Sequence, residues 1–226
     1  MLNYIVSEAR TGRVGDMMRK SMRHTTGSRW GPALLLVSPL SACGGTTPPP
    51  EPGQSRGVPP DLRGRRVILL PVQRVVGVAG DPDAELAFTL RDRGREVDWI
   101  LSGEVSRVLA RSPAIQTQIT GLPVGLFLQG EVQRIGDPLF GQIRRMAALV
   151  AADAVLLPVR ASFERDSRDS GASPRVRFTA ALVEARSGRV VWFGVEEGGD
   201  FPREDPRGLA SAVECLARTL LWYVPT

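Results

Sequence analysis

Two apolar runs of six residues are the clearest feature in the pattern of hydrophobic and polar positions along this chain. They are residues 67–72 (VILLPV) and 154–159 (AVLLPV), and they are nearly identical. A run that is apolar at every position is typical of a strand buried on both faces of a sheet. Because proline is poorly tolerated inside a central strand, Pro71 and Pro158 are predicted to lie near the same end of neighbouring strands.

Further strands are predicted where shorter apolar runs occur, or where apolar and polar residues alternate. They cover residues 86–90, 97–101, 124–128, 176–182 and 190–195. Ser187-Gly188 lies between the last two and supplies a turn. These two strands are therefore predicted to pair as a hairpin.

Three helices are predicted from apolar residues spaced three and four positions apart. Their predicted caps are Ser102, Asp137 and Asp205, and Pro138 is predicted to take the first position of the second helix. The predicted buried faces are Val105, Val108 and Leu109; Leu139, Ile143, Met146, Ala147 and Val150; and Leu209, Val213, Leu216 and Leu220. The order strand, helix, helix, strand, hairpin, helix indicates an α/β fold, a single sandwich domain with a mixed sheet and flanking helices.

The segment before this domain has the layout of a secretory signal peptide. Four basic residues between positions 19 and 29 form a positive region, and an apolar core with small residues follows in residues 30–43 (WGPALLLVSPLSAC). Its last four residues, Leu40-Ser41-Ala42-Cys43, resemble the lipobox of bacterial lipoproteins. The resemblance implies cleavage before Cys43 and acyl chains on the sulfur and the new amino group of that residue.

The alternatives are an uncleaved membrane anchor and a cysteine that falls there by chance. An anchor needs about 20 consecutive apolar residues, whereas this run is shorter and is interrupted by Pro32 and Pro39. Gly44-Gly45 follows the cysteine, and similar lipoproteins that stay at the inner membrane carry an aspartate there. The resemblance therefore implies an outer-membrane protein, held on the periplasmic face by its lipid.

Three parts are predicted along the chain: a signal peptide in residues 1–42, the lipidated cysteine with a Pro/Gly-rich linker in residues 43–60, and the α/β periplasmic domain in residues 61–226. Met17, Met18 and Met22 are alternative start residues, because the signal is otherwise unusually long. The linker has few apolar residues to bury and is predicted to lack packed structure. A proline-rich tether extends about 3.1 Å per residue, which gives this linker a reach of roughly 50 Å.

Charge gives no reason to expect a nucleic-acid partner. The chain carries 29 Lys and Arg residues and 24 Asp and Glu residues. Six of those cations and two of those anions lie in residues 1–42, so 23 and 22 remain after cleavage. A nucleic-acid surface needs clustered positive charge, and the mature domain is nearly neutral.

The residues left after cleavage argue against catalysis, a bound metal and a cofactor. The single histidine, His24, is removed with the signal. Its loss excludes Ser-His-Asp and Cys-His nucleophiles and the usual imidazole ligands of catalytic zinc. With Cys43 acylated, Cys215 has no disulfide partner in the chain and is predicted to be a buried helix residue.

Other stretches with possible chemistry have simpler interpretations. Residues 196–205 (EEGGDFPRED) are predicted to be a solvated loop, because calcium needs six or more convergent oxygens. Adjacent Glu196 and Glu197 would point to opposite faces of a strand. Residues 77–80 (GVAG) lack the Gly-Lys-Ser/Thr of a phosphate-binding loop. Trp192 lies in an apolar strand and is predicted to belong to the core.

Three features of the domain carry a resemblance to a known group of periplasmic domains. The first strand ends apolar-apolar-Pro, a helix leads into residues 151–155 (AADAV), and the hairpin reads ARSGRVVW at residues 185–192. This pattern resembles the N-terminal domain of TolB and is similar to the periplasmic domains of the curli secretion lipoprotein and of penicillin-binding-protein activator lipoproteins. The resemblance covers residues 67–222 and implies an α/β fold and a role in the cell envelope. Neither a propeller sequence nor a pair of long amphipathic hairpins is recognisable, which argues against a whole TolB and against a curli-type pore.

A docking site is predicted at the carboxyl end of the two copied strands. If these strands are parallel, the stretches after them, residues 73–83 and 160–174, emerge side by side. Ligands tend to bind at this end of open α/β sheets, and Arg74, Arg160 and Arg165 would line the site. The alternative is that both stretches are ordinary solvated connections.

These features together predict a lipid-anchored, non-catalytic cell-envelope protein that binds a partner in envelope assembly or transport. The expected partners are the membrane and an unknown envelope protein, and self-association stays open. The alternative is a carboxylate-dependent periplasmic hydrolase, which a deep pocket with two facing carboxylates would favour.

Overall fold

The structure is a computed structural model that describes residues 47–112, 115–165 and 173–223. The predictions on the signal peptide, the start residue, the lipobox and Cys43 lie outside these residues. The described residues belong to a unit that begins at Gly44.

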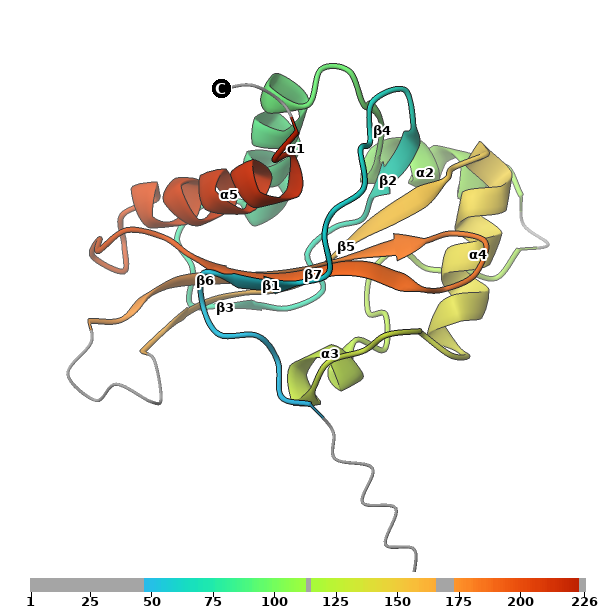
Figure 1. Cartoon of the computed structure of the whole chain (residues 1–226). Helices are drawn as coiled ribbons and strands as arrows, with labels where there is room; N and C mark the ends of the chain where they lie inside the picture. Colours follow the sequence, from blue (N-terminus) through green and yellow to red (C-terminus); the bar gives the residue numbers. More distant parts are fainter. Residues whose placement is uncertain (1–46, 113–114, 166–172, 224–226) are drawn as a thin grey trace, which may run out of the picture. The chain divides into compact units, whose positions relative to one another are not determined.

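Helices cover both faces of one mixed sheet of seven strands in this part of the chain (Figure 1), which confirms the predicted fold class. The strands are β1 (Gln54–Arg56), β2 (Arg66–Leu69), β3 (Val75–Val76), β4 (Asp98–Leu101), β5 (Ala154–Glu164), β6 (Arg175–Glu184) and β7 (Val190–Glu197). Their order is β1-β7-β6-β5-β2-β4, and β3 pairs with β5 beyond the end of β2. The pairs of β2 with β4, β2 with β5 and β3 with β5 are parallel, and β5, β6, β7 and β1 pair in antiparallel succession.

Five helices flank the sheet in the described residues: α1 (Pro82–Arg93), α2 (Ser102–Ala110), α3 (Gly125–Gln129), α4 (Leu139–Val150) and α5 (Arg207–Leu220). α1 and α5 pack on one face, and an ion pair between Arg93 and Glu214 joins them. α2, α3 and α4 pack on the other face (Figure 1). None of the helices in the described ranges has the length and apolar content to span a membrane.

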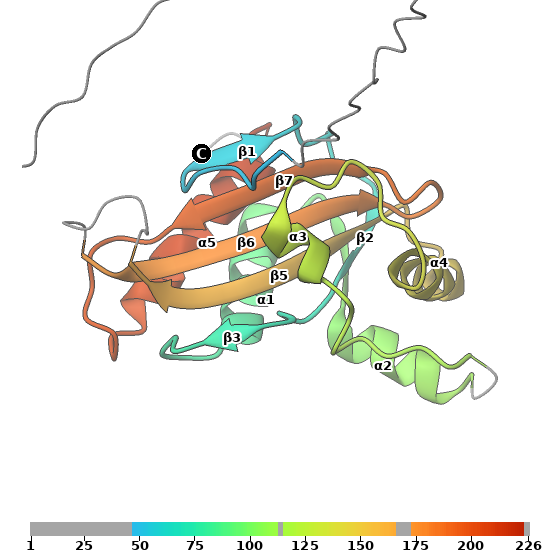
Figure 2. The same cartoon turned by 90° about the horizontal axis from the view of Figure 1, so that it is seen from below.

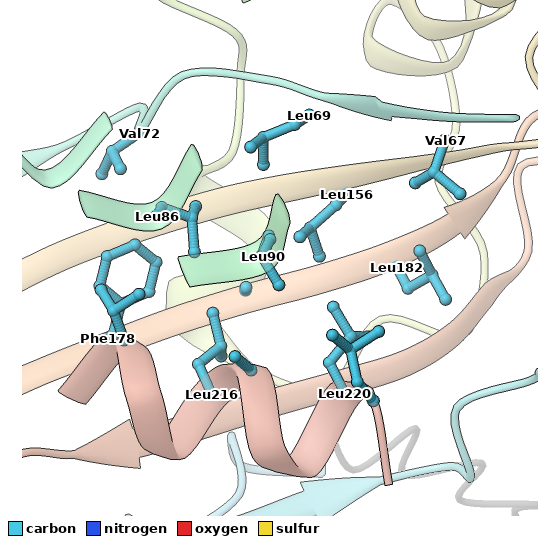
Figure 3. Close-up of a cluster of buried hydrophobic side chains, with 14 of the residues drawn as sticks. Val67, Leu69, Val72, Leu86, Leu90, Leu156, Phe178, Leu182, Leu216 and Leu220 are labelled. Carbon is cyan, nitrogen blue, oxygen red and sulfur yellow. The ribbon is translucent and has the colours of Figure 1, made fainter. Parts of the chain in front are cut away.

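The sheet separates two hydrophobic cores, because neighbouring residues of each central strand point to opposite faces. In β2, Val67 and Leu69 belong to the core under α1 and α5, whereas Ile68 belongs to the core under α2, α3 and α4. Figure 3 shows the first core, where Leu86 of α1 and Leu216 of α5 point toward the strands. The prediction that this strand is buried on both faces is therefore confirmed.

The predicted strand at residues 86–90 is wrong, because these residues lie in α1. Asp81 caps this helix with its carboxylate, which accepts the backbone N–H groups of Asp83 and Ala84 at 3.0 and 3.1 Å. Pro82 follows at the first helical position, where its missing N–H costs nothing. Apolar residues lie on both sides of this helix, so the helical period is hard to recognise in the sequence.

The extended piece predicted at residues 124–128 is also wrong, because α3 occupies this position. A single helical turn is enough to bury Phe127, whose ring lies 5.6 Å from that of Phe193 in β7. A short apolar run has no period that separates helix from strand, so only packing on β7 decides its conformation.

The predicted faces of the later helices are confirmed: the named apolar residues of α4 and α5 are all buried. The caps differ in detail. α2 begins at Ser102 itself and has no side-chain cap. Asp137 accepts the N–H of Gly141 at 2.9 Å, across the first turn of α4, and Asp205 accepts that of Arg207 at 2.9 Å.

Asp153, in the AADAV motif, joins the beginnings of two central strands. Its N–H donates to the carbonyl of Arg66 at 2.9 Å, and its carboxylate accepts the N–H of Arg66 at 3.0 Å. Its carbonyl accepts the N–H of Ala185 at 3.0 Å. The motif therefore sets the register between β2, β5 and the turn of the hairpin.

The expectation of an unpacked linker up to residue 60 is wrong for its described part. β1 pairs with the edge of β7, with Gln54 opposite Val195. Upstream of β1, the carbonyl of Thr47 accepts the N–H of Glu131 at 2.7 Å. Downstream, Trp222 donates its indole N–H to the carbonyl of Pro59 at 2.9 Å. Backbone pairing at an open sheet edge needs no apolar side chains, so composition could not reveal it.

Candidate functional site

The two copied strands are parallel, and their prolines lie at the same end, as predicted. β2 and β5 pair with Leu69 opposite Leu156, which places Pro71 beside Pro158 two positions later. The N–H of Gln73 then donates to the carbonyl of Pro158 at 3.0 Å.

The stretches after these prolines do not emerge as two neighbouring loops. The chain after β2 continues along β5, where Arg74 accepts the N–H of Ala161 at 2.8 Å and β3 pairs with β5. β5 itself extends to Glu164, because β6 pairs with it from Ala154 to Glu164. The prediction that residue 160 begins a connection is therefore wrong.

Two of the three predicted docking arginines come close together. Arg74 lies one position before the pair of Val75 and Ala161, so the register places it beside Arg160. Arg165 follows five positions after Arg160, which is about 17 Å along an extended chain. A shared docking role for these three residues stays a prediction.

Arg160 belongs to a ladder of charges across three strands, which we call the β5–β7 ladder (Arg160, Glu164, Arg177 and Glu197). Glu164 accepts from Arg160 at 2.8 Å and from Arg177 at 3.2 Å. Arg177 also donates to Glu197 at 2.6 Å. Each of these side chains is less than a third exposed, so solvent screens the ladder less than it screens surface pairs.

A crevice of about 660 Å³ lies at the carboxyl ends of β2 and β4. The connection after β2 leads to α1 on one face of the sheet, whereas the connection after β4 leads to α2 on the other. Such a divergence opens a gap at the ends of the strands and is the usual ligand position in open α/β sheets. The crevice therefore lies between β2 and β4, not between β2 and β5 as the copied runs suggest.

Carboxylates reach this crevice from both helices: Asp81 and Asp83 from α1, and Glu104 from α2. The carboxylate of Asp81 is the N-cap of α1 and accepts backbone N–H groups there. Asp83 accepts the N–H of Val72 at 2.6 Å, which ties the end of β2 to α1. Partial burial raises the pKa of the Asp83 carboxyl, and the neighbouring charge of Asp81 raises it further, against the opposing hydrogen bond from Val72. Two of the three carboxylates thus have structural roles.

The outer side of α1 continues this crevice as a surface with an exposed aromatic ring. Phe88 is 71% exposed and lies in a shallow hollow that shares Ala84, Ala87 and Arg91 with the crevice. We call these four residues the α1 face. The side chain of Arg91 makes no hydrogen bond and no ion pair with any described residue. Our sequence interpretation missed this surface, although an Asp-Pro cap at residues 81–82 places Phe88 on the helix side opposite Leu86 and Leu90.

The prediction of a solvated loop over residues 196–205 is wrong for its first two residues, which form the end of β7. Glu196 is buried on the α5 side of this strand, whereas Glu197 joins Arg177 on the opposite face, so the prediction that they point to opposite faces is confirmed. Trp192 is fully buried. Cys215 lies on α5 but is only partly buried. Within the described ranges, no group of three or more His, Cys, Asp or Glu residues is placed to hold a metal ion.

No protein-family model matches this chain, and no curated protein is significantly similar to it. Among solved structures, it is similar to the LpoB C-terminal domain from Salmonella enterica, with 16% identity over 61% of this chain and 84% of that chain and a TM-score of 0.39. It is also similar to PelC from Paraburkholderia phytofirmans, solved as a dodecamer, with 16% identity over 76% and 99% of the two chains and a TM-score of 0.39. The LpoB C-terminal domain from Escherichia coli is also similar, with 14% identity over 59% of this chain and 82% of that chain and a TM-score of 0.35. These TM-scores are below 0.5, and the function proposed below does not rest on them.

Proposed function

We propose that this chain is a lipid-anchored, non-catalytic protein of the bacterial cell envelope that binds another envelope protein through the α1 face. The exposure of Phe88 beside Arg91 carries the proposal. Aromatic residues and arginine are the residue types that contribute most to protein interfaces. The ring lies in a hollow that joins the crevice, so an aromatic anchor, a cation and a concave surface are available together to a partner.

The anchor follows from the lipobox, and it has its own test. Mass spectrometry of membrane-extracted protein is expected to find a mature chain of 184 residues that begins with acylated Cys43. Cys43→Ser is expected to release the protein from the membrane or to block its processing. An unacylated amino terminus upstream of Cys43 would contradict the lipid anchor.

Photo-crosslinking in native envelopes tests the docking surface. A photoreactive residue at position 88 is expected to give a discrete adduct with one envelope protein. Arg144 on the outer side of α4 is the matched control position, because it is also exposed and its side chain makes no hydrogen bond or ion pair in the described chain. Arg74 is a third position, which tests the docking site predicted from the sequence.

The captured protein then allows a quantitative test. Phe88→Ala is expected to weaken its binding at least about tenfold, the effect of losing roughly 1.4 kcal/mol from a central aromatic contact. Arg144→Ala is expected to leave the affinity unchanged. Equal affinities for the wild-type protein and Phe88→Ala would reject the α1 face as the binding surface.

The crevice also defines a test of the hydrolase alternative, since Asp83 and Glu104 lie on its two helices. A hydrolase that worked with these groups would lose its activity in Glu104→Gln without losing stability. We expect instead that Glu104→Gln has no functional effect. Asp83→Asn should lower only the stability, because it weakens the acceptor for the N–H of Val72.

A further inference from the structure

The anchor and the folded domain are separated by very little chain. Thr47 is already bound to Glu131 through its carbonyl, Pro50 is buried, and Gly53 donates its N–H to Val195 at 2.8 Å. Only residues 44–46 lie between Cys43 and the first of these contacts. Four residue steps in a fully extended chain span about 14 Å. A domain held so closely cannot stand off from the membrane that holds Cys43.

The attachment point of the folded domain is Thr47, the first described residue that contacts it. The surface beside this attachment point carries positive charge. A hollow of about 460 Å³ is lined by the arginines Arg56, Arg134 and Arg189, and Glu131 is the only carboxylate among its lining residues. All three arginines are exposed. The side chains of Arg56 and Arg134 make no hydrogen bond or ion pair with any described residue, and the guanidinium of Arg189 has only a distant contact of 3.8 Å with Glu184. Three cations thus face solvent against one anion.

The hollow and the attachment point share a residue. Glu131 lines the hollow and also binds Thr47. Glu131 lies two positions after the end of α3, and Leu126 in that helix is 41% exposed. Figure 1 shows α3 beside the point where the chain reaches the domain, on the opposite side of the sheet from α1 and α5. We call this region the anchor-side surface (Arg56, Leu126, Arg134 and Arg189).

We infer that the anchor-side surface lies on the membrane and that its arginines contact the head groups of anionic phospholipids. This inference rests on the proposed acylation of Cys43. Anionic lipid surfaces attract clustered arginines that are held within a Debye length, which is about 8–10 Å at physiological salt. Leu126 supplies an apolar contact at the head-group level, as exposed apolar side chains do in interfacial helices. In this orientation the α1 face points away from the membrane and is accessible to a partner.

Depth-dependent fluorescence quenching tests this inference on the acylated protein. Cys215→Ala removes the competing thiol, and Leu126→Cys carries a fluorophore. The protein is reconstituted into vesicles of phosphatidylglycerol and phosphatidylethanolamine that contain a head-group-labelled quencher lipid. The matched position is Arg218→Cys on α5, on the opposite face of the sheet. The label at position 126 is expected to be quenched at least about twofold more than the label at 218, since a docked interfacial surface lies at the level of the labelled head groups.

Charge variants test the contribution of the arginines. Arg56→Glu with Arg134→Glu is expected to reduce quenching at position 126 to the level at 218, and vesicles of neutral phosphatidylcholine should do the same. Arg111→Glu with Arg144→Glu is the control, because it makes the same change in net charge at two exposed arginines without side-chain partners in the described chain. This control is expected to leave the quenching unchanged.

The outcomes separate this inference from the proposed function. A protein without acyl chains on Cys43 contradicts the lipid anchor. An acylated protein with equal quenching at 126 and 218 overturns the membrane contact, and strong quenching in neutral vesicles overturns the role of the head-group charge. Suppose that position 126 is shielded from a water-soluble thiol reagent in native envelopes but not in purified vesicles. This result would assign the anchor-side surface to a protein partner and overturn the inference.

Discussion

Glu196 is a carboxylate that lies almost entirely inside the domain, at 6% exposure on the α5 side of β7. Burial raises its pKa, and a hydrogen bond from Thr219 and the charge of Arg218 offset this effect only in part. The neutral acid is therefore the form that the folded domain favours. As the pH rises from the unfolded pKa of about 4.5 through the raised folded pKa, the buried group ionises and stability is lost.

Glu196→Gln is expected to raise the thermal midpoint at neutral pH. Glutamine keeps the shape and the acceptor oxygen but cannot ionise. At pH 4 both proteins hold a neutral group in this position, so their midpoints should nearly coincide. Above the folded pKa the variant should be more stable by a few degrees. Thermal unfolding measured from pH 4 to pH 8 checks this prediction.

The adjacent residue gives a control with the opposite sign. Glu197 points to the other face of β7 and pairs with Arg177 at 2.6 Å. Glu197→Gln removes this charge pair and is expected to lower the midpoint at neutral pH. A fall in stability for both variants would show that Glu196 is held as a stabilising anion, contrary to the burial argument.

At the scale of elements, β1 extends the domain beyond the boundary that composition suggests. Gly57 ends this strand in a left-handed conformation with φ of 77° and packs against the backbone of β7. A Cβ atom at this position would lie 2.3 Å from the carbonyl oxygen of Val191. Gly53, at the other end of β1, has a similar φ of 74° but open space around it. The two glycines therefore form a matched pair.

Gly57→Ala is expected to destabilise the domain more than Gly53→Ala does. Both alanines incur the cost of a left-handed conformation, roughly 1–2 kcal/mol. Only the alanine at 57 must also displace β1 from β7. We expect an additional loss of at least about 1 kcal/mol, which lowers the thermal midpoint by roughly 2–4 °C in a domain of this size. Equal midpoints for the two variants would mean that β1 is not bound to β7 in solution.

At the scale of the whole molecule, one end of the sheet is held by charges where no described helix covers it. Figure 2 shows this end of β5, β6 and β7 in front of α1 and α5, with α3 lying further along the strands. The β5–β7 ladder crosses these strands on the uncovered face. The aliphatic stems of such side chains can cover a sheet, which is consistent with the 1% exposure of Ser162 in β5.

Charge reversal at the two predicted docking arginines should therefore have unequal effects on stability. Arg160→Glu places a second anion beside Glu164 in a partly buried ladder, and we expect a loss of about 1–2 kcal/mol. Arg74→Glu changes an exposed side chain without a described partner, and we expect a change within about 0.5 kcal/mol. Urea unfolding of each variant measures the difference. A loss of partner binding in Arg74→Glu therefore reports on the binding surface itself. The same loss in Arg160→Glu alone would be confounded by the lower stability of that variant.

Adding Glu164→Arg to Arg160→Glu restores opposite charges within that pair and tests the cause. Partial recovery of the lost stability is expected, although Arg177 then faces a cation. No recovery would indicate that Arg160 stabilises the strand through its packing and not through its charge.

Local pattern alone determined the strands that are buried on both faces, the hairpin, and the helices α4 and α5. These elements bury many apolar side chains at a clear period, so each position carries information about its own environment. The pattern gave wrong predictions at α1 and α3, where it predicts residues 86–90 and 124–128 to be extended. α1 exposes Phe88 opposite its buried residues, which hides the helical period, and α3 is a single turn whose conformation depends on the contact of Phe127 with Phe193.

Only the tertiary structure decided where the crevice lies and where β1 pairs. The crevice exists because the connections after β2 and β4 leave on opposite faces of the sheet, and no stretch of sequence records that divergence. β1 binds through backbone groups, which every residue possesses, so its pairing with β7 leaves no trace in composition. The lipobox is the reverse case: it is read from four consecutive side chains, and its prediction needs no fold at all.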